Sequence, residues 1–422
     1  MQKTSRTPRL AAALALVLAL VLGPAVVVAG PAGATARPAA RPAALDPATS
    51  AGWATHWLAT QVTPGGYIPD HVGDPDPSDT VLSALALAAA GHDQATFTSM
   101  MSWLAGHVDA VTGTGADADP GSTGYLILAV VAGHDDPTDF GGVDLVARLQ
   151  ATFGLYEPGL YGSYTSVGDP TYSGVFEQSL AILGLQAAGV AETPAALDWL
   201  VAQQCGGTDE FDGAWMSYRA PVTPGVPADG LTPCTAFDSS TFTGIDTNST
   251  SLALEALTAA GVTPAHDALG WLARTQNPDG SFGFYVGNDG DPNSTALVVQ
   301  AIVAAGESPT TGRWALAGGN PVSALESFQL GCDAASTDQG ALTFPGTGGG
   351  PNLLATEEGI WGLAQASFPL GAVSFSPSPT PCQAATTTTT APATSTTSTG
   401  GSAAATEASA AVPVDATPAL TG

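Results

Sequence analysis

Acidic residues stand where paired carboxylates could act as catalysts. Asp79, Asp246, Asp291, Glu357 and Glu358 each lie just before or within the start of an apolar helical pattern. If these helices run side by side, the carboxyl groups gather at one face, and two carboxyl groups at the mouth of a cavity are what glycoside hydrolysis requires. An acid in the first turn of a helix more commonly caps it and complements its dipole. Capping is therefore the preferred interpretation of these five residues.

The cysteines favour disulfides over metal binding or catalysis. The chain has four, Cys205, Cys234, Cys332 and Cys382, and no two are spaced as a CxxC pair. Three pairings are open, and an even number of cysteines in an exported chain is typical of disulfides. The most local pairing, Cys205 with Cys234 and Cys332 with Cys382, is the one predicted. We expect no metal site and no cofactor.

The elements that must position these side chains form a repeat. A Thr is followed by an apolar run that ends in a Gly eleven positions later, at Thr80 to Gly91, Thr250 to Gly261 and Thr295 to Gly306. Looser copies start at Thr123, Gln178 and Thr356. These six segments are apolar nearly all round, as expected of helices in an inner layer. An amphipathic segment, often with a Trp-Leu pair, precedes most copies and fits an outer helix.

A Gly-rich turn that ends in an aromatic residue joins most outer segments to the inner segment that follows. The aromatic residues are Tyr67, Tyr164, Trp215 and Phe282. If the turns gather at one end of the repeats, these rings surround the opening there. They are predicted to line the mouth of a ligand site.

One position of the inner segments carries polar or aromatic residues in three consecutive copies. Five residues after the opening Thr, copies four to six carry Glu255, Gln300 and Trp361, whereas copies one to three carry Leu. Equal spacing predicts equal depth on neighbouring helices, so these residues are candidates for one wall of a central cavity. The alternative is that they hydrogen-bond between helices, because buried polar groups usually find partners within the fold.

The fifth copy resembles a known repeat. Its stretch Gln276-Asn277-Pro278-Asp279-Gly280-Ser281-Phe282-Gly283 is similar to the glutamine-tryptophan repeat of the prenyltransferase and squalene oxidase (terpenoid cyclase-like) proteins, and Gln204 with Asp212 to Trp215 follows it. The resemblance covers roughly residues 50–370. It implies an all-α fold, an (α/α)6 toroid of six helix-pair repeats in which six inner helices are ringed by six outer ones.

The catalytic residues of the resembling families are missing. The DxDD acid motif of class II terpene cyclases does not occur, and the six His residues lie almost all in the first half, far in sequence from every Cys. A zinc site like that of protein prenyltransferases is thus not expected, and Cys205-Gly206-Gly207-Thr208 lacks the Glu and Gln of a thioester motif. An enzymatic role is disfavoured but left open.

Both ends of the chain differ from the middle. Residues 1–36 have the basic start, short apolar run and small residues of a secretory signal peptide, and residues 37–47 form a linker. The repeat domain spans residues 48–375. Residues 376–422 are a Thr-, Ser-, Ala- and Pro-rich tail, a composition typical of disordered stalks.

The charge narrows the choice of partners. The formal net charge is −28, and the only basic residues beyond Arg41 are Arg148, Arg219, Arg274 and Arg313. Such a surface repels nucleic acid and anionic lipid. Together with the signal peptide, this charge predicts a protein that is secreted or associated with the cell surface and is not stably inserted in a membrane after signal cleavage. Because the catalytic motifs are missing, we expect it to bind a small molecule or cell-envelope component without catalysis. The alternative is an enzyme on the same fold, terpenoid cyclase-like or glycan-active.

Overall fold

A computed structural model describes residues 46–115, 118–162, 173–207, 210–223 and 226–382. This part of the chain is predominantly helical, as predicted. The signal peptide, most of the linker, Tyr164 and residues 383–422 of the tail lie outside it. None of its helices is long and apolar enough to cross a membrane.

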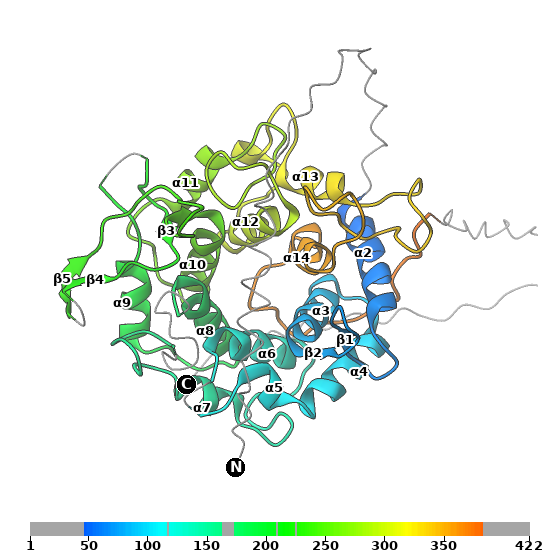
Figure 1. Ribbon diagram of the computed structural model, residues 1–422, viewed down its shortest axis with the longest axis horizontal. Coiled ribbons are helices and arrows are strands. Elements are labelled where there is room, and N and C mark those ends of the chain that lie inside the picture. Colours follow the sequence, from blue (N-terminus) through cyan, green and yellow to red (C-terminus); the bar gives the residue numbers. More distant parts are fainter. Residues whose placement is uncertain (1–45, 116–117, 163–172, 208–209, 224–225, 383–422) are drawn as a thin grey trace, which may run out of the picture. The chain divides into compact units, whose positions relative to one another are not determined.

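Six inner helices close into a ring, which confirms the predicted α/α toroid (Figure 1). Each contacts the next, and the last contacts the first. They are α3 (Pro77–Ala90), α6 (Pro120–Ala132), α8 (Val175–Ala187), α10 (Thr247–Ala259), α12 (Pro292–Ala304) and α14 (Leu353–Leu363). The outer helices that precede them are α2 (Pro47–Gln61), α4 (Gln94–Ala105), α7 (Leu145–Gln150), α9 (Pro194–Ala202), α11 (Ala268–Thr275) and α13 (Pro321–Phe328).

The remaining elements are short and lie in the connections. They are helix α5 (Val108–Thr112), the 3-10 turn η2 (Gly312–Trp314) and strands β1 (Ile68–Pro69), β2 (Pro75–Asp76), β3 (Trp215–Met216), β4 (Pro221–Thr223), β5 (Val226–Leu231) and β6 (Ile245–Asp246). The strands form three antiparallel pairs, β1 with β2, β3 with β6 and β4 with β5. In the second pair Trp215 lies opposite Asp246, so the Gly-rich turn is paired directly with the residue that opens α10.

The repeated Thr joins each Gly-rich turn to its inner helix. The Thr250 hydroxyl accepts a hydrogen bond from the Trp215 backbone N–H at 2.9 Å and donates one to the Asp246 carbonyl at 2.7 Å. Thr80, Thr295 and Thr356 accept the equivalent N–H groups of Ile68, Phe282 and Leu342. Burial of these hydroxyls costs little because each one has its partners.

The repeated Gln joins one repeat to the next. The Gln204 side chain bonds the Gly213 carbonyl within its own repeat and both backbone groups of His266 in the following one. Gln329 does the same at the end of the array, because its amide donates to the Ser50 carbonyl at 2.8 Å. Ser50 belongs to the first outer helix, so this bond closes the ring.

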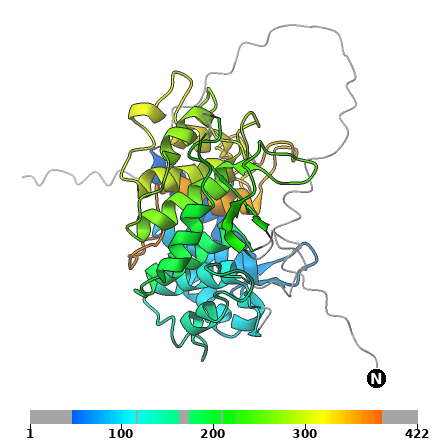
Figure 2. The same cartoon turned by 90° about the vertical axis from the view of Figure 1, so that its left-hand side faces the viewer.

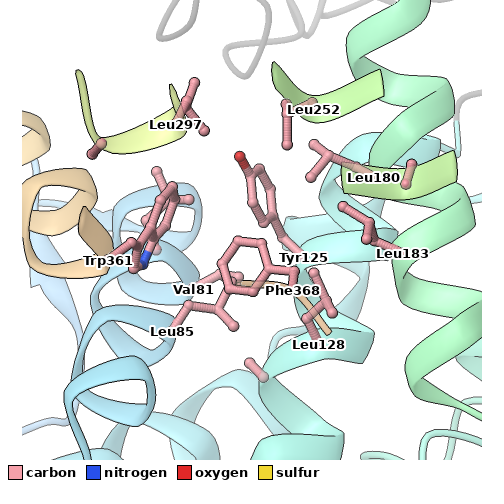
Figure 3. Packing of buried hydrophobic residues seen from close by; sticks show 14 of the residues in the cluster. Val81, Leu85, Tyr125, Leu128, Leu180, Leu183, Leu252, Leu297, Trp361 and Phe368 are labelled. Carbon is pink, nitrogen blue, oxygen red and sulfur yellow. The ribbon is translucent and has the colours of Figure 1, made fainter. Parts of the chain in front are cut away.

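The bore of the ring is filled from one end by the chain that follows α14. Phe368 lies among Leu85, Leu128, Leu183 and Trp361 of the inner helices (Figure 3) and is 2% exposed. The segment then crosses the carboxyl ends of α3 and α6, where Ser376 N–H donates to the Gly91 carbonyl at 2.9 Å. In the edge-on view of Figure 2, the orange C-terminal segment and the blue β1–β2 hairpin lie on opposite sides of the ring.

Both predicted disulfides are confirmed. Cys205–Cys234 closes the insertion between α9 and α10, and Cys332–Cys382 ties the C-terminal segment to the loop after α13. Ser378 adds a hydrogen bond from its hydroxyl to the Asp93 carboxylate at 2.6 Å. The structure therefore describes an attached chain up to Cys382, beyond the boundary at residue 375 expected from composition.

Glycines allow α6 and α8 to pack closely. A Cβ on Gly124 would lie 2.3 Å from the carbonyl oxygen of Leu180, and one on Gly184 would lie 2.9 Å from the Cα of Gly124. Neither contact can be relieved by rotating a side chain, because the opposing atoms belong to the backbone.

We predict that Gly124→Ala lowers the free energy of unfolding by about 2 kcal/mol, since overpacking a tight contact typically costs 1–3 kcal/mol. Chemical denaturation measures the change. Gly350→Ala is the control, because a Cβ there meets nothing within 4 Å. Equal stability of the two variants would show that α6 and α8 do not approach this closely.

Candidate functional site

The amino ends of the inner helices meet at one face of the ring, which we call the mouth. Ser83 on α3 donates to Glu357 on α14 at 2.5 Å, and Asn293 on α12 donates to Glu358 on α14 at 2.8 Å. All four residues lie in the first two turns of their helices. Neighbouring inner helices are therefore parallel and in register, as the repeat predicts.

Capping explains only part of the acidic set at the mouth. Asp246 and Asp291 are N-caps, since their carboxylates accept the backbone N–H groups of Ser249 and Ser294. The capping interpretation is thus confirmed for these two. Asp79, Glu357 and Glu358 are not caps, because Asp76 caps α3 and Asn352 caps α14. Asp79 still lies in the first turn of α3, where its charge complements the helix dipole, whereas Glu357 and Glu358 lie beyond the first turn of α14.

Two adjacent glutamates on α14 point toward different neighbours. One residue step turns a helix by about 100°, so Glu357 reaches Ser83 on α3 while Glu358 reaches Asn293 on α12. Glu357 has no exposed surface, whereas Glu358 keeps part of its surface accessible. Asp79, one turn before Ser83 on α3, is also partly accessible.

Burial and crowding favour the protonated form of these acids. Burial and the nearby Asp76 raise the pKa of Asp79 to about 7. Burial and Asp291 raise the pKa of Glu358 to about 7 against the opposing Asn293 bond. Burial raises the pKa of Glu357 well above its ordinary value, and the Asp79 charge adds to the effect. Near neutral pH Asp79 and Glu358 are therefore both partly protonated.

Tyr125 and Glu177 complete the mouth opposite α14. Tyr125 on α6 is 9% exposed, and its pKa is raised by burial and by the charges of Glu358, Glu255 and Glu177. Its hydroxyl thus lies among carboxyl groups from three other helices. Glu177 on α8 accepts the Gly174 N–H at 3.1 Å, and burial and Asp119 raise its pKa to about 8. We define the mouth cluster as Asp79, Tyr125, Glu177, Asn293, Glu357 and Glu358.

Two buried polar atoms of the mouth cluster have no partner within the described chain. They are Oε2 of Glu357, which is completely buried, and Oδ1 of Asn293, whose residue is 8% exposed. The other atoms of the same two groups are bonded, to Ser83 and Glu358. A buried polar atom without a hydrogen bond costs about 1–3 kcal/mol. An ordered water beside either atom would remove that cost.

The predicted column of Glu255, Gln300 and Trp361 lies deeper, around the bore. Trp361 and the Leu residues at the same position of the first three copies surround Phe368 in Figure 3. The Glu255 carboxylate accepts the Phe368 N–H at 2.6 Å. Glu255, Gln300 and Trp361 are 1%, 0% and 0% exposed. In this conformation no ligand touches them, although both amide atoms of Gln300 and Nε1 of Trp361 have no partner in the described residues.

The aromatic residues of the Gly-rich turns belong to the packing between helices. Trp215 and Phe282 have no exposed surface, and the Trp215 indole donates to the Leu200 carbonyl at 2.8 Å. Tyr67 packs against Trp103 with ring centroids 5.5 Å apart. Tyr164 lies outside the described residues. The structure does not bring the three described rings together around the mouth.

Different aromatic residues lie at the mouth. Phe237, Phe242, Phe284 and Tyr285 are all partly exposed and in mutual contact. Phe284 is fixed to the start of α10, because its carbonyl accepts the Thr247 N–H at 2.9 Å. Sequence reasoning missed these residues because they fall in loops that the repeat does not cover. The sequence offers one signal for them. Two Phe residues lie close together in each of the two loops, Phe237 with Phe242 and Phe282 with Phe284, and Tyr285 follows Phe284.

No group of three or more His, Cys, Asp or Glu side chains in the described ranges is arranged to hold a metal ion. The mouth cluster has the acids for such a site but not their convergence on one point.

Comparison with known proteins supports the fold. No family model and no curated protein sequence matches the chain. An inactive double Asp→Ala variant of the alpha-1,6-mannanase of Salegentibacter sp. HEL1_6, in complex with alpha-1,6-mannotetrose, matches with a TM-score of 0.50 and 12% identity, over 76% of this chain and 98% of that one. The type II terpene cyclase MstE from Scytonema gives 0.49 and 13% over 76% and 98%. The ent-copalyl diphosphate synthase from Streptomyces platensis gives 0.41 and 17% over 69% and 51%. The chain has an α/α-toroid fold.

We predict that the protein loses thermal stability as the pH rises from 5 to 8. Unfolded Asp and Glu side chains titrate near pH 4, whereas Asp79, Glu177 and Glu358 titrate at about 7, 8 and 7 in the folded protein. Between these values the folded state binds more protons, so its stability falls with rising pH. Melting temperatures at pH 5 and pH 8 measure the effect.

Matched variants separate the ionisation of these buried acids from the mutual repulsion of surface carboxylates, which also grows with pH in a protein of net charge −28. Replacing Glu177 and Glu358 together by Gln should reduce the difference in melting temperature between pH 5 and pH 8. Glu210→Gln, at an exposed position, should leave it unchanged. A melting temperature that rises with pH in the starting protein would contradict the raised pKa values.

Proposed function

We propose that the protein is an exported binding protein that captures an uncharged ligand, rich in hydroxyl or amide groups, at the mouth of the ring and catalyses nothing. The observation that carries the proposal is the pair of partly exposed acids at the mouth, Asp79 and Glu358, which cap no helix and lie beside two buried atoms without a partner in the described chain, Glu357 Oε2 and Asn293 Oδ1. Protonated carboxyl groups donate hydrogen bonds and amide oxygens accept them, which suits a ligand that does both.

The charge of the site argues against an anionic ligand. The four Arg residues of the described chain are engaged elsewhere: Arg148 with Asp109, Arg219 with backbone carbonyls, Arg274 with the Asp212 carbonyl and Arg313 with Glu307. A phosphate or carboxylate at the mouth would meet carboxyl groups and no cation. The ligand is therefore a small neutral molecule or a neutral component of the cell envelope.

Export rests on the leader-like residues 1–36 and on the two disulfides, which persist in oxidising compartments. The tail of residues 383–422 has the composition of a stalk. Both features suit a protein that is released or held at the cell surface, where it meets its ligand.

We predict that Asn293→Ala and Glu358→Gln each weaken binding of the ligand that copurifies with the native secreted protein by about tenfold, the loss of roughly one hydrogen bond to a charged or buried group. Mass spectrometry identifies the ligand, and calorimetry on the stripped protein gives the affinity. Asp109→Asn, an exposed acid on α5, is the control. Unchanged affinity in both mouth variants would refute the site.

A second candidate is a glycan-active enzyme with the same carboxyl groups. Asp79 and Glu358 both have pKa values of about 7, so a protonated and an ionised carboxyl group coexist at the mouth near neutral pH. Cleavage of a polysaccharide that is lost in both Asp79→Asn and Glu358→Gln would establish this function in place of simple capture.

We predict that the protein does not cyclise squalene or prenyl diphosphates. Terpenoid cyclisation needs a cavity that encloses the hydrocarbon, whereas Leu85, Leu128 and Leu183 around the bore have no surface accessible even to water. Incubation with squalene and geranylgeranyl diphosphate, followed by gas chromatography, tests this. A cyclic product that is absent with Asp79→Ala would contradict it.

A further inference from the structure

Four aromatic side chains form a compact platform beside the mouth cluster. Phe237 and Tyr285 are stacked with centroids 4.7 Å apart, and Phe237 meets the edges of Phe242 and Phe284 at 5.0 and 5.1 Å. Each ring is partly exposed. The rings come from two loops, one that precedes β6 and one that precedes α12, so their meeting is a property of the fold.

The first loop is constrained so that it presents its rings. Asp238 and Thr243 pair through the Asp238 N–H and the Thr243 carbonyl at 2.7 Å, and Phe242 between them has a left-handed backbone with φ 58°. This conformation is unfavourable for a bulky residue. Gly244 (φ 126°) packs so closely on the preceding turn that a Cβ would lie 2.4 Å from the Ala236 carbonyl oxygen. Such strain persists only where surrounding structure imposes it.

A short chain of contacts links the platform to the mouth cluster. The Asp291 backbone N–H donates to the carbonyl of Phe282, two residues before Phe284, at 3.0 Å, and Asn293, two residues after Asp291, donates to Glu358 at 2.8 Å. The platform and the mouth cluster thus lie next to each other at the amino end of α12. A ligand that spans both meets exposed ring faces first and then carboxyl and amide groups.

We infer that the platform is a stacking subsite for a pyranose ring of a neutral glycan, with another unit of the same glycan hydrogen-bonded by the mouth cluster. The inference rests on the proposed function and names its ligand class. A pyranose has an apolar C–H face, which aromatic rings cover, and an equatorial belt of hydroxyl groups, which carboxyl and amide groups bind. A hydrocarbon would satisfy the platform but leave the mouth cluster unpaired, and an anion would be repelled.

The test uses the full secreted chain and three neutral probes, the linear trisaccharides of mannose, glucose and N-acetylglucosamine. Calorimetry should show binding of at least one probe. Saturation transfer from the protein's aromatic protons should reach the C–H protons of the sugar. Phe242→Leu and Tyr285→Ala should each weaken binding at least tenfold, whereas Tyr285→Phe should retain it within about twofold, because the ring is kept. Circular dichroism checks that each variant remains folded.

Phe375→Leu is the matched control, because Phe375 is also partly exposed and in contact with another ring, Phe97, but belongs to the C-terminal segment. Loss of probe binding in the platform variants and in Glu358→Gln, but not in this control, supports the inference. Probe binding that is lost in Glu358→Gln and retained in both platform variants overturns the subsite but leaves the proposed function intact. If no trisaccharide binds, the glycan inference fails. The proposed function is then still tested by the affinity of the copurified ligand for the Asn293→Ala variant.

Discussion

The hydrogen bond between the repeated Thr hydroxyl and the Gly-rich turn sets the geometry of the ring. In four of the six repeats, this hydroxyl accepts the backbone N–H of the residue at the end of the turn. In the third, Gln178 takes its place and accepts the Tyr161 N–H at 2.7 Å. Because the bond holds the turn against the first helical turn, every connection enters its inner helix at nearly the same angle. The amino ends of the helices then meet at one face, and the mouth cluster is a consequence.

The ring is open to solvent at one end and filled at the other. The end that holds Phe368 is packed as densely as a core, and its polar member Glu255 is used to bind the Phe368 backbone. The mouth holds carboxyl groups that no helix needs as caps, with Asp79 and Glu358 partly exposed. This division directs function to the mouth, since its acids are partly accessible to solvent and are not used to cap a helix or to fill the bore.

The sequence predicts the fold well because the repeat encodes it several times. Thr250 and Gln204 mark a helix start and a turn that recur, so a weak signal in one copy is supported by the others. The column of Glu255, Gln300 and Trp361 follows from the same register. Figure 3 shows Trp361 and the Leu residues at the same position of the first three copies, Leu85, Leu128 and Leu183, around Phe368. The repeat does not predict the position of Phe368, because this residue follows the last repeat. Phe368 fills the bore beside Trp361.

The candidate site is predicted less well, for a physical reason. The sequence does not distinguish an acid that caps a helix, as Asp291 does, from one near a helix start that faces a neighbouring helix, as Glu358 does. Which role an acid has depends on its exact distance from the first residue of the helix and on which side chains the neighbouring helix places opposite it. The sequence of a single repeat specifies neither. The platform aromatic Phe242 is harder still, because its loop lies outside the repeat.

Closure of the ring by Gln329 and Ser50, which are 279 residues apart in the chain, changes how the protein must fold. An open solenoid can grow repeat by repeat and fray from its ends. Here the first and last repeats are each other's neighbours, so once both have formed neither has a free end from which to fray. Closing the ring requires contacts between residues far apart in the chain, and such contacts form more slowly than local ones. Once closed, it has no terminal repeat at which hydrogen exchange or proteolysis can begin.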